Sequence, residues 1–250
     1  MSCAYIAFTE TGLKLAERLA LLHPGSVGRG GKNGVKLSDW TAENFQKSDA
    51  LIFIGAVGIA VRAIAPHCKS KATDPAVIVL DERGRFSIPI LSGHLGGAND
   101  LAKKLASICG AVPVITTATD VEGVFAVDEW AKAQNCHVLE PERIKTVSGT
   151  LLADKVVYYD SQWKITGTQP KNVFPADENH QADFSVTLHP QSDALHLVPK
   201  ICVLGVGCKR GTSAEHIEAT FKQFCKERKN KSGNCSRNRF IRSESRWKGE

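Results

Sequence analysis

The residues best suited to chemistry lie in the glycine-rich segment 91–97 (LSGHLGG), between an apolar run and an amphipathic one. His94 stands in this turn, and an ordinary pKa of about 6.5 suits an imidazole to acid–base work near neutrality. Backbone amides at the start of a helix favour an anion, so Gly93, Gly96 and Gly97 are candidate substrate-binding residues. Alternatively, His94 only hydrogen-bonds a neighbouring loop and the glycines only permit a tight turn.

Three other polar turns also follow apolar runs, at residues 55–58, 81–82 and 116–120. Ligands of open α/β sheets bind beyond the carboxyl ends of the strands, so we expect these turns to lie beside His94. Asp120 is then a candidate catalytic base or a residue that orients His94. Thr116 and Thr117 are candidate substrate contacts. Ordinary turn chemistry is the alternative for the carboxylates.

Ser92 completes the candidate catalytic set, although the chain lacks the GxSxG pattern of a serine nucleophile elbow there. Arg62, Lys69 and Lys71 could bind the carboxylates of an acidic ligand. A solvated helix face explains these three cations equally well. Arg83 and Arg85 could extend the same basic face, which is a hypothesis about clustering.

Metal, nucleotide and redox chemistry have little support in the sequence. The eight cysteines form no CxxC pair, so we expect neither a structural zinc site nor a redox dithiol, and we predict no metal ligands. Residues 204–211 (LGVGCKRG) resemble a phosphate loop only loosely, because they lack the GK[ST] ending.

Strand-like and helical patterns alternate over the first half of the chain, which predicts an α/β domain with an open parallel or mixed sheet at residues 1–135. Within it, residues 76–80 and 86–91 predict a hairpin, residues 96–109 a helix and residues 116–120 a polar loop. Residues 136–198 predict a small α+β region or linker, with a helix at 141–153 and strands at 156–160 and 163–167. The stretch 169–191 is polar.

Residues 199–227 predict the start of a second, incomplete α/β domain, with a strand at 201–207 and a helix capped near Gly211 and Ser213. The formal charge of +6 lies entirely in residues 228–250, where eight basic residues face two acidic ones. We expect this tail to be disordered. Because the rest is neutral, we expect no nucleic-acid partner. The chain shows neither a membrane span nor a signal peptide, so we expect a cytoplasmic protein.

The block at residues 55–106 (GAVGIAVRAIAPHCKSKATDPAVIVLDERGRFSIPILSGHLGGANDLAKKLA), followed by PVITTATDVEGVFAVDEWA, resembles the amino-terminal domain of the CbiG family. Residues 203–221 (VLGVGCKRGTSAEHIEATF) resemble the start of the CbiG and CobE carboxy-terminal domain. The resemblance implies a cobalt-precorrin-5A hydrolase of anaerobic cobalamin synthesis, which opens a δ-lactone, releases acetaldehyde and leaves cobalt-precorrin-5B. This reaction is classed as hydrolysis of a carbon–carbon bond.

The same resemblance implies an anionic tetrapyrrole substrate that carries the cobalt, no cofactor of the protein's own, and other enzymes of the pathway as partners. The family domain would continue beyond the helix that follows Ser213, and permissive codons allow residues from Lys229 on to be read, one base later, as KISLETVAEIASFDLKADGKE. We therefore suspect a frameshift. A tetrapyrrole-binding or partner protein without catalysis is the alternative function.

Overall fold

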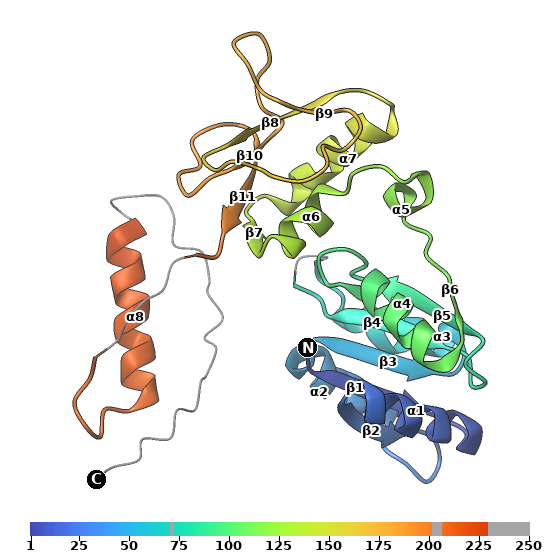
Figure 1. The fold of residues 1–250 in the computed structure, drawn as a ribbon. Coiled ribbons are helices and arrows are strands. Elements are labelled where there is room, and N and C mark those ends of the chain that lie inside the picture. The colour runs from blue at the N-terminus through green and yellow to red at the C-terminus, as the bar shows by residue number, and fades with distance from the viewer. Residues whose placement is uncertain (71–72, 202–206, 230–250) are drawn as a thin grey trace.

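The chain folds around two separate β-sheets in a computed structural model that describes residues 1–70, 73–201 and 207–229 (Figure 1). The first sheet has the strand order β2-β1-β3-β4-β5-β6. Strand β5 is antiparallel to β4 and the other neighbours are parallel, so the predicted α/β domain with a mixed sheet is confirmed. The strands are β1 (Cys3–Ala7), β2 (Gly25–Arg29), β3 (Ala50–Ile54), β4 (Ala76–Leu80), β5 (Phe86–Leu91) and β6 (Val112–Pro113).

Helices cover both faces of this sheet, which explains why its central strands are continuous apolar runs. Every residue of β1, β3 and β4 is buried. Leu19 and Leu105 belong to the core on one face, and Trp40 and Ile64 belong to the core on the other. The covering helices are α1 (Glu10–Leu22) and α4 (Ala98–Cys109) on the first face, and α2 (Leu37–Lys47) and α3 (Val57–Ile64) on the second. The short 3₁₀ helix η1 (Ala65–His67) follows α3.

The reversal between β4 and β5 separates the four polar turns that we expected to lie together. Strands β3 and β4 end at one edge of the sheet, with Gly55 and Asp81. Strand β5 ends opposite the start of β4, where Leu91 pairs with Val77, and β6 runs parallel to β5. The turns at residues 92–94 and 116–120 therefore share the other edge, and the expectation of one common edge is wrong.

The second sheet has the order β7-β11-β10-β8-β9, with β7 antiparallel to β11 and the other neighbours parallel. Its core contains Val127, Leu151, Phe184 and Leu197. Leu95, from the loop after β5, packs against this core. The elements are α5 (Ala118–Glu122), α6 (Val127–Ala133), β7 (Cys136–Val138), η2 (Pro141–Arg143), α7 (Ile144–Leu152), β8 (Val157–Ser161), β9 (Val173–Pro175), β10 (Phe184–Val186) and β11 (Leu195–Pro199).

Two expectations for these elements are wrong. Residues 163–167 form no strand. The polar stretch 169–191, for which we predicted no strand of its own, contains strands β9 and β10. Each of these strands is only three residues long, too short for a clear alternation of apolar and polar positions. Residues 118–120 lie in helix α5 rather than in a polar loop. The helix expected at 141–153 is confirmed by η2 and α7.

The last described helix, α8 (Ala214–Lys229), confirms the helix predicted at this position. The backbone N–H of His216 donates to Ser213 Oγ at 3.2 Å, which is the expected side-chain cap. The strand predicted at 201–207 falls mainly on residues 202–206, and these, like the basic tail from residue 230, lie outside the described residues. Among the helices that the structure describes, none has the length and apolar character needed to cross a membrane.

Candidate active site at the junction of the two sheets

The loop between β5 and α4 is closed by its own backbone hydrogen bonds. The N–H groups of Gly97, Ala98 and Asn99 donate to the carbonyl oxygens of His94, Ser92 and Gly93, at 2.9, 3.1 and 3.0 Å. These amides are therefore satisfied within the loop. Of the glycines expected to bind an anion, Gly97 already uses its amide within the loop, and a role of Gly93 and Gly96 in substrate binding stays a prediction.

Close packing explains the glycines of this loop. A Cβ on Gly96 would overlap Ser92 Cβ and lie 2.7 Å from the Ser92 carbonyl oxygen, and one on Gly93 would lie 2.8 Å from Asn99 Oδ1. Gly97 has a φ of 82°, in the left-handed region that glycine adopts readily. Ser92 is buried, and its hydroxyl donates to the carbonyl oxygen of Asp74 at 3.0 Å. Ser92 therefore anchors the loop to the segment before β4.

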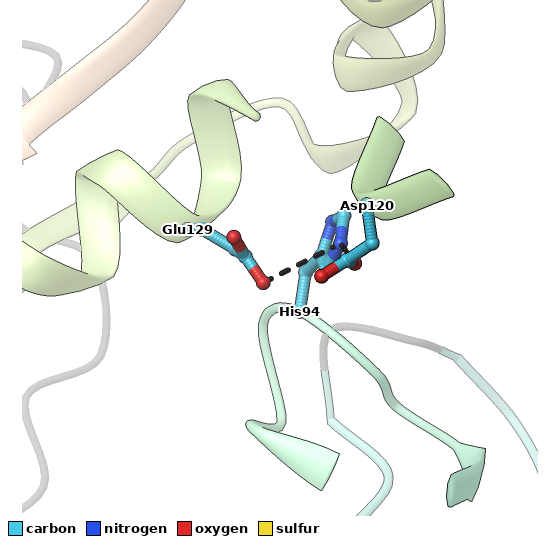
Figure 2. A group of neighbouring side chains, drawn as sticks. All are labelled: His94, Asp120 and Glu129. Carbon is cyan, nitrogen blue, oxygen red and sulfur yellow. Dashed lines mark hydrogen bonds and ion pairs between the residues drawn. The ribbon is translucent and has the colours of Figure 1, made fainter. Parts of the chain in front are cut away.

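His94 is surrounded by the carboxylates of three residues, of which Figure 2 shows Asp120 and Glu129 and the third is Asp128. Its Nδ1 contacts Asp128 Oδ1 and Oδ2 at 3.1 and 3.2 Å. Its Nε2 lies 2.9 Å from Asp120 Oδ2 and 3.5 Å from Glu129 Oε1. Thr119 Oγ1 also lies 3.5 Å from Nε2. The imidazole side chain is only 10% exposed, so these neighbours, rather than bulk water, set its charge.

The carboxylates hold His94 in its protonated form at neutral pH. Burial by itself lowers the pKa of His94, but the hydrogen bonds from Asp128 and Asp120, with the charges of Asp128 and Glu129, outweigh it and raise the pKa to about 9. The imidazolium is therefore available as a proton donor near pH 7, not as a base. From an ordinary histidine pKa we expect His94 to act as an acid or as a base, and the structure favours the role of acid.

Asp120, on helix α5, is fixed by two further side chains besides His94. Asn99 Nδ2 donates to Asp120 Oδ2 at 3.0 Å, and Lys103 Nζ donates to Oδ1 at 3.1 Å. Burial favours the neutral acid, but the bonds from His94 and Lys103 outweigh it and lower the pKa of Asp120. The structure thus brings the candidate residues His94 and Asp120 into direct contact.

Asp128 and Glu129 complete the cluster, and we did not select them as site residues from the sequence. Both lie in the first turn of α6, whose apolar residues Val127 and Ala131 belong to the second core. Burial raises the pKa of Glu129. Two consecutive acids at the start of a helix are also ordinary capping chemistry, so the pair by itself carries no signal of a site.

The other candidate substrate contacts differ in their exposure and in their hydrogen-bond partners. Thr117 Oγ1 accepts from Asn99 Nδ2 at 2.9 Å and so shares a donor with Asp120, whereas Thr116 is exposed. Lys69 is exposed near the same edge, since its backbone N–H donates to Asp74 Oδ2 at 2.8 Å. Lys71 lies outside the described residues.

The basic face expected from the sequence is divided by the sheet. Arg62 is exposed on α3, where its guanidinium donates to the carbonyl oxygen of Gly58 at 3.3 Å. The backbone N–H groups of Arg83 and Arg85 bind Asp81, at the opposite edge from His94. The hypothesis that all these cations line one face is therefore wrong.

Two lysines that we did not select lie beside the loop instead. Lys103 on α4 pairs with Asp120, and its side chain is 48% exposed. Lys132 on α6 has its Nζ in the space that a side chain at position 97 would fill. Both therefore lie close enough to the His94 cluster to meet a carboxylate of a ligand bound there. Lysines inside amphipathic helices are also typical of a solvated helix face, so their sequence positions do not mark them as site residues.

Ligand atoms of His94, Asp120 and Glu129 lie within 4.8 Å of one another, a spacing that could hold a divalent cation. Nε2 of His94 must lose its proton to bind a metal, and a pKa of about 9 opposes that loss near pH 7. The geometry therefore permits a metal, while the electrostatics favour a proton between His94 and Asp120.

The segment that carries this site matches a known family. The family model described as "Cobalamin synthesis G N-terminal" matches residues 39–120, which include His94, Lys103 and Asp120. The chain is 37% identical over 234 residues to the cobalt-precorrin-5A hydrolase of Salmonella typhimurium, across 84% of this chain and 67% of that protein.

The chain belongs to the cobalt-precorrin-5A hydrolase (CbiG) family. It is also 33% identical over 204 residues to the cobalt-precorrin-5A hydrolase of Priestia megaterium, across 73% of this chain and 54% of that protein. A cobalamin biosynthesis protein G homolog from Sulfolobus solfataricus superimposes with a TM-score of 0.48 at 22% identity, over 90% of this chain and 69% of that one. The chain thus spans between about half and two thirds of the lengths of these two curated relatives.

Proposed function

We propose that this protein is a cobalt-precorrin-5A hydrolase that opens the δ-lactone of its substrate and releases the two-carbon fragment as acetaldehyde, giving cobalt-precorrin-5B. The observation that carries the proposal is the imidazolium of His94 among Asp120, Asp128 and Glu129, in and beside the segment matched by the family model. The two curated hydrolases at 37% and 33% identity support the substrate.

His94 is the proton donor in this proposal. Hydrolysis of a lactone breaks the single bond between the carbonyl carbon and the ring oxygen. The departing ring oxygen must receive a proton, and the carbonyl oxygen carries negative charge in the tetrahedral intermediate. A charged imidazole supplies that proton and stabilises that charge once the substrate oxygen replaces Asp120 Oδ2 as the hydrogen-bond acceptor of Nε2. Asp128 holds Nδ1 and so keeps the ring oriented.

Glu129 is the carboxylate best placed to activate water. Its side chain is 34% exposed, whereas the side chains of Asp120 and Asp128 are 14% and 7% exposed. Burial raises the pKa of Glu129, while the pKa of Asp120 is lowered. Carboxyl groups whose pKa values are pushed apart take different acid–base roles, so we assign the base to Glu129 and charge stabilisation of His94 to Asp120.

The carboxylates of an anionic tetrapyrrole need cations, and Lys103, Lys132 and Lys69 lie around the loop that carries His94. Cobalt enters with the substrate in this proposal, and the residues of the cluster act on protons. We expect the reaction in the cytoplasm, where the other enzymes of the pathway are the candidate partners.

The test is incubation of the purified full chain with cobalt-precorrin-5A and measurement of acetaldehyde. We expect His94→Gln and Glu129→Gln to lower kcat/KM by about 100-fold or more, because each removes a proton-transfer group. His216→Gln, at an exposed position on α8, is the matched control and should leave the rate unchanged. Substrate binding without acetaldehyde would overturn the proposal in favour of a tetrapyrrole-binding protein. Full activity of His94→Gln would overturn the assigned site.

A further inference from the structure

A second group of reactive side chains lies in the other half of the molecule, where strand β11 borders a cavity of about 1050 Å³. The cavity is lined by residues of the second sheet and its loops, including Arg143, Asp160, Ser192 and His196. The residues of the His94 cluster do not line it. This cavity therefore needs an explanation of its own.

Ser192, His196 and Glu140 form a continuous hydrogen-bonded chain at this cavity. Ser192 Oγ lies 3.2 Å from His196 Nε2, and His196 Nδ1 lies 3.0 Å from Glu140 Oε1. The other oxygen of Glu140 accepts from the backbone N–H of His196 at 2.9 Å. A hydroxyl, an imidazole and a carboxylate in this order are the three parts of an activated serine nucleophile.

The carboxylate decides which nitrogen of His196 carries a proton. An ionised carboxylate only accepts hydrogen bonds, so Nδ1 of His196 must donate to Glu140. In the neutral ring Nε2 is then an acceptor, and the hydrogen bond with Ser192 must be donated by the hydroxyl. This tautomer is the one that a general base needs in order to take the proton of a serine.

The fold holds this arrangement from two neighbouring strands. Strand β7 pairs antiparallel with β11, and the backbone N–H of Leu139 donates to the carbonyl oxygen of His196 at 3.0 Å. The ladder thus places Glu140, the next residue, beside the His196 ring. The side chain of His196 is only 4% exposed, whereas Ser192 is exposed. The base is thereby kept rigid and the hydroxyl remains open to a ligand.

We propose that Ser192, His196 and Glu140 form a nucleophilic site that hydrolyses carboxylic esters, separate from the reaction assigned to His94. Ser192 Oγ bonds to the ester carbonyl carbon as its proton passes to His196 Nε2. The ester carbon–oxygen bond then breaks, and the alcohol leaves with that proton. Water attacks the acyl-serine through the same base and releases the carboxylic acid, so the balance is ester plus water to acid plus alcohol.

Charge at the cavity selects the kind of ester. Asp160, Asp177, Asp183 and Asp193 line it, whereas Arg143 is the only lysine or arginine among the described lining residues. The guanidinium of Arg143 already donates hydrogen bonds to the carbonyl oxygens of Asp193 and Ala194, which leaves fewer of its donors for a ligand. An excess of carboxylates repels anionic ligands. The site therefore favours neutral or cationic esters over a polycarboxylate macrocycle.

The test uses the full chain with 4-nitrophenyl acetate as a neutral ester, and 4-nitrophenyl hemisuccinate as an anionic one. We expect hydrolysis of the neutral ester above the uncatalysed rate, and slower hydrolysis of the anionic ester. Ser192→Ala and His196→Gln should each lower kcat/KM by about 100-fold or more. A biotinylated fluorophosphonate should label the wild-type chain on Ser192, located by peptide mass spectrometry.

Ser192→Asn separates catalysis from a purely structural role. Ser192 Oγ also accepts from the backbone N–H of Ala194 at 3.3 Å, and an asparagine oxygen can accept the same bond without offering a nucleophile. We expect Ser192→Asn to be as inactive as Ser192→Ala while it melts like the wild type. Activity retained in either variant would overturn the proposal, as would a wild-type chain that neither hydrolyses the neutral ester nor takes the label. Acetaldehyde release from cobalt-precorrin-5A should be unchanged in Ser192→Asn, which keeps the two sites experimentally distinct.

Discussion

Asp128 contacts Nδ1 of His94 with both oxygens of its carboxylate, at 3.1 and 3.2 Å, and thereby joins the two halves of the molecule. His94 belongs to the loop that follows β5 of the first sheet. Asp128 lies on α6, whose neighbouring residue Val127 is fully buried in the second core. The charge on His94 therefore depends on how the two cores are packed together.

Replacement of Asp128 by asparagine should lower the pKa of His94 from about 9 toward its ordinary value, because the neutral amide cannot stabilise the imidazolium as the carboxylate does. An NMR titration of the His94 ring protons measures this change. Glu129→Gln is the control and should give a smaller shift, since Glu129 lies 3.5 Å from Nε2 and is more exposed. Equal shifts in both variants would contradict the leading role of Asp128.

Stability should decrease as the pH rises through the folded pKa of His94. That pKa is raised to about 9, so the imidazolium contributes fully below its unfolded value of about 6.5 and the contribution disappears above pH 9. The full effect is on the order of 3 kcal/mol. Urea denaturation across this interval measures it, and His94→Gln should flatten the dependence while His216→Gln keeps it. A wild-type free energy of unfolding that stays constant across this interval would argue against a charged His94.

Gly96→Ala should destabilise the protein by about 1 to 3 kcal/mol, because the added Cβ overlaps Ser92. Gly149→Ala is the matched control. Gly149 lies within helix α7 and an added Cβ meets nothing within 4 Å, so alanine should stabilise the protein by about 0.5 to 1 kcal/mol through its higher helix propensity. Melting curves of both variants provide the comparison, and the idea fails if the two changes have the same sign.

Ser87→Ala should leave the protein as stable as the wild type or stabilise it by about 1 kcal/mol. Ser87 is fully buried on β5, and its hydroxyl is the buried side-chain group without a hydrogen-bond partner among the described residues. Removing an unsatisfied hydroxyl removes its desolvation cost. Ser185→Ala, at a buried position on β10, is a comparison substitution of the same type. A clear loss of stability in Ser87→Ala, measured by urea denaturation, would show that the hydroxyl does find a partner.

The first sheet could be predicted because its central strands are short apolar runs separated by glycine turns and amphipathic helices. Such runs are typical of strands covered on both faces. Ile52 of β3 and Ile78 of β4 are fully buried, as this predicts. The second sheet was harder to predict. Strands β9 and β10 lie in a polar stretch, and each is only three residues long, too short to show a clear alternation of apolar and polar positions.

The candidate site was predicted only in part. His94 and Asp120 could be selected because a histidine and a carboxylate follow strands that end at polar turns. Asp128, Glu129 and Lys103 carry no such local signal, since acids at the start of a helix and a lysine on a helix surface are common. The group of Ser192, His196 and Glu140 was missed for a different reason, because Glu140 lies 56 residues from His196 in the sequence.

The sequence by itself determined the family, the α/β character of the first half and the histidine in its glycine-rich turn, because these depend on local pattern and on matching segments. Only the tertiary structure decided which edge of the sheet His94 occupies, which carboxylates surround it and that it is charged at neutral pH. The physical reason is that strand direction and the docking of α6 on a second core are long-range properties, and the pKa of a buried group follows the neighbours that they bring to it.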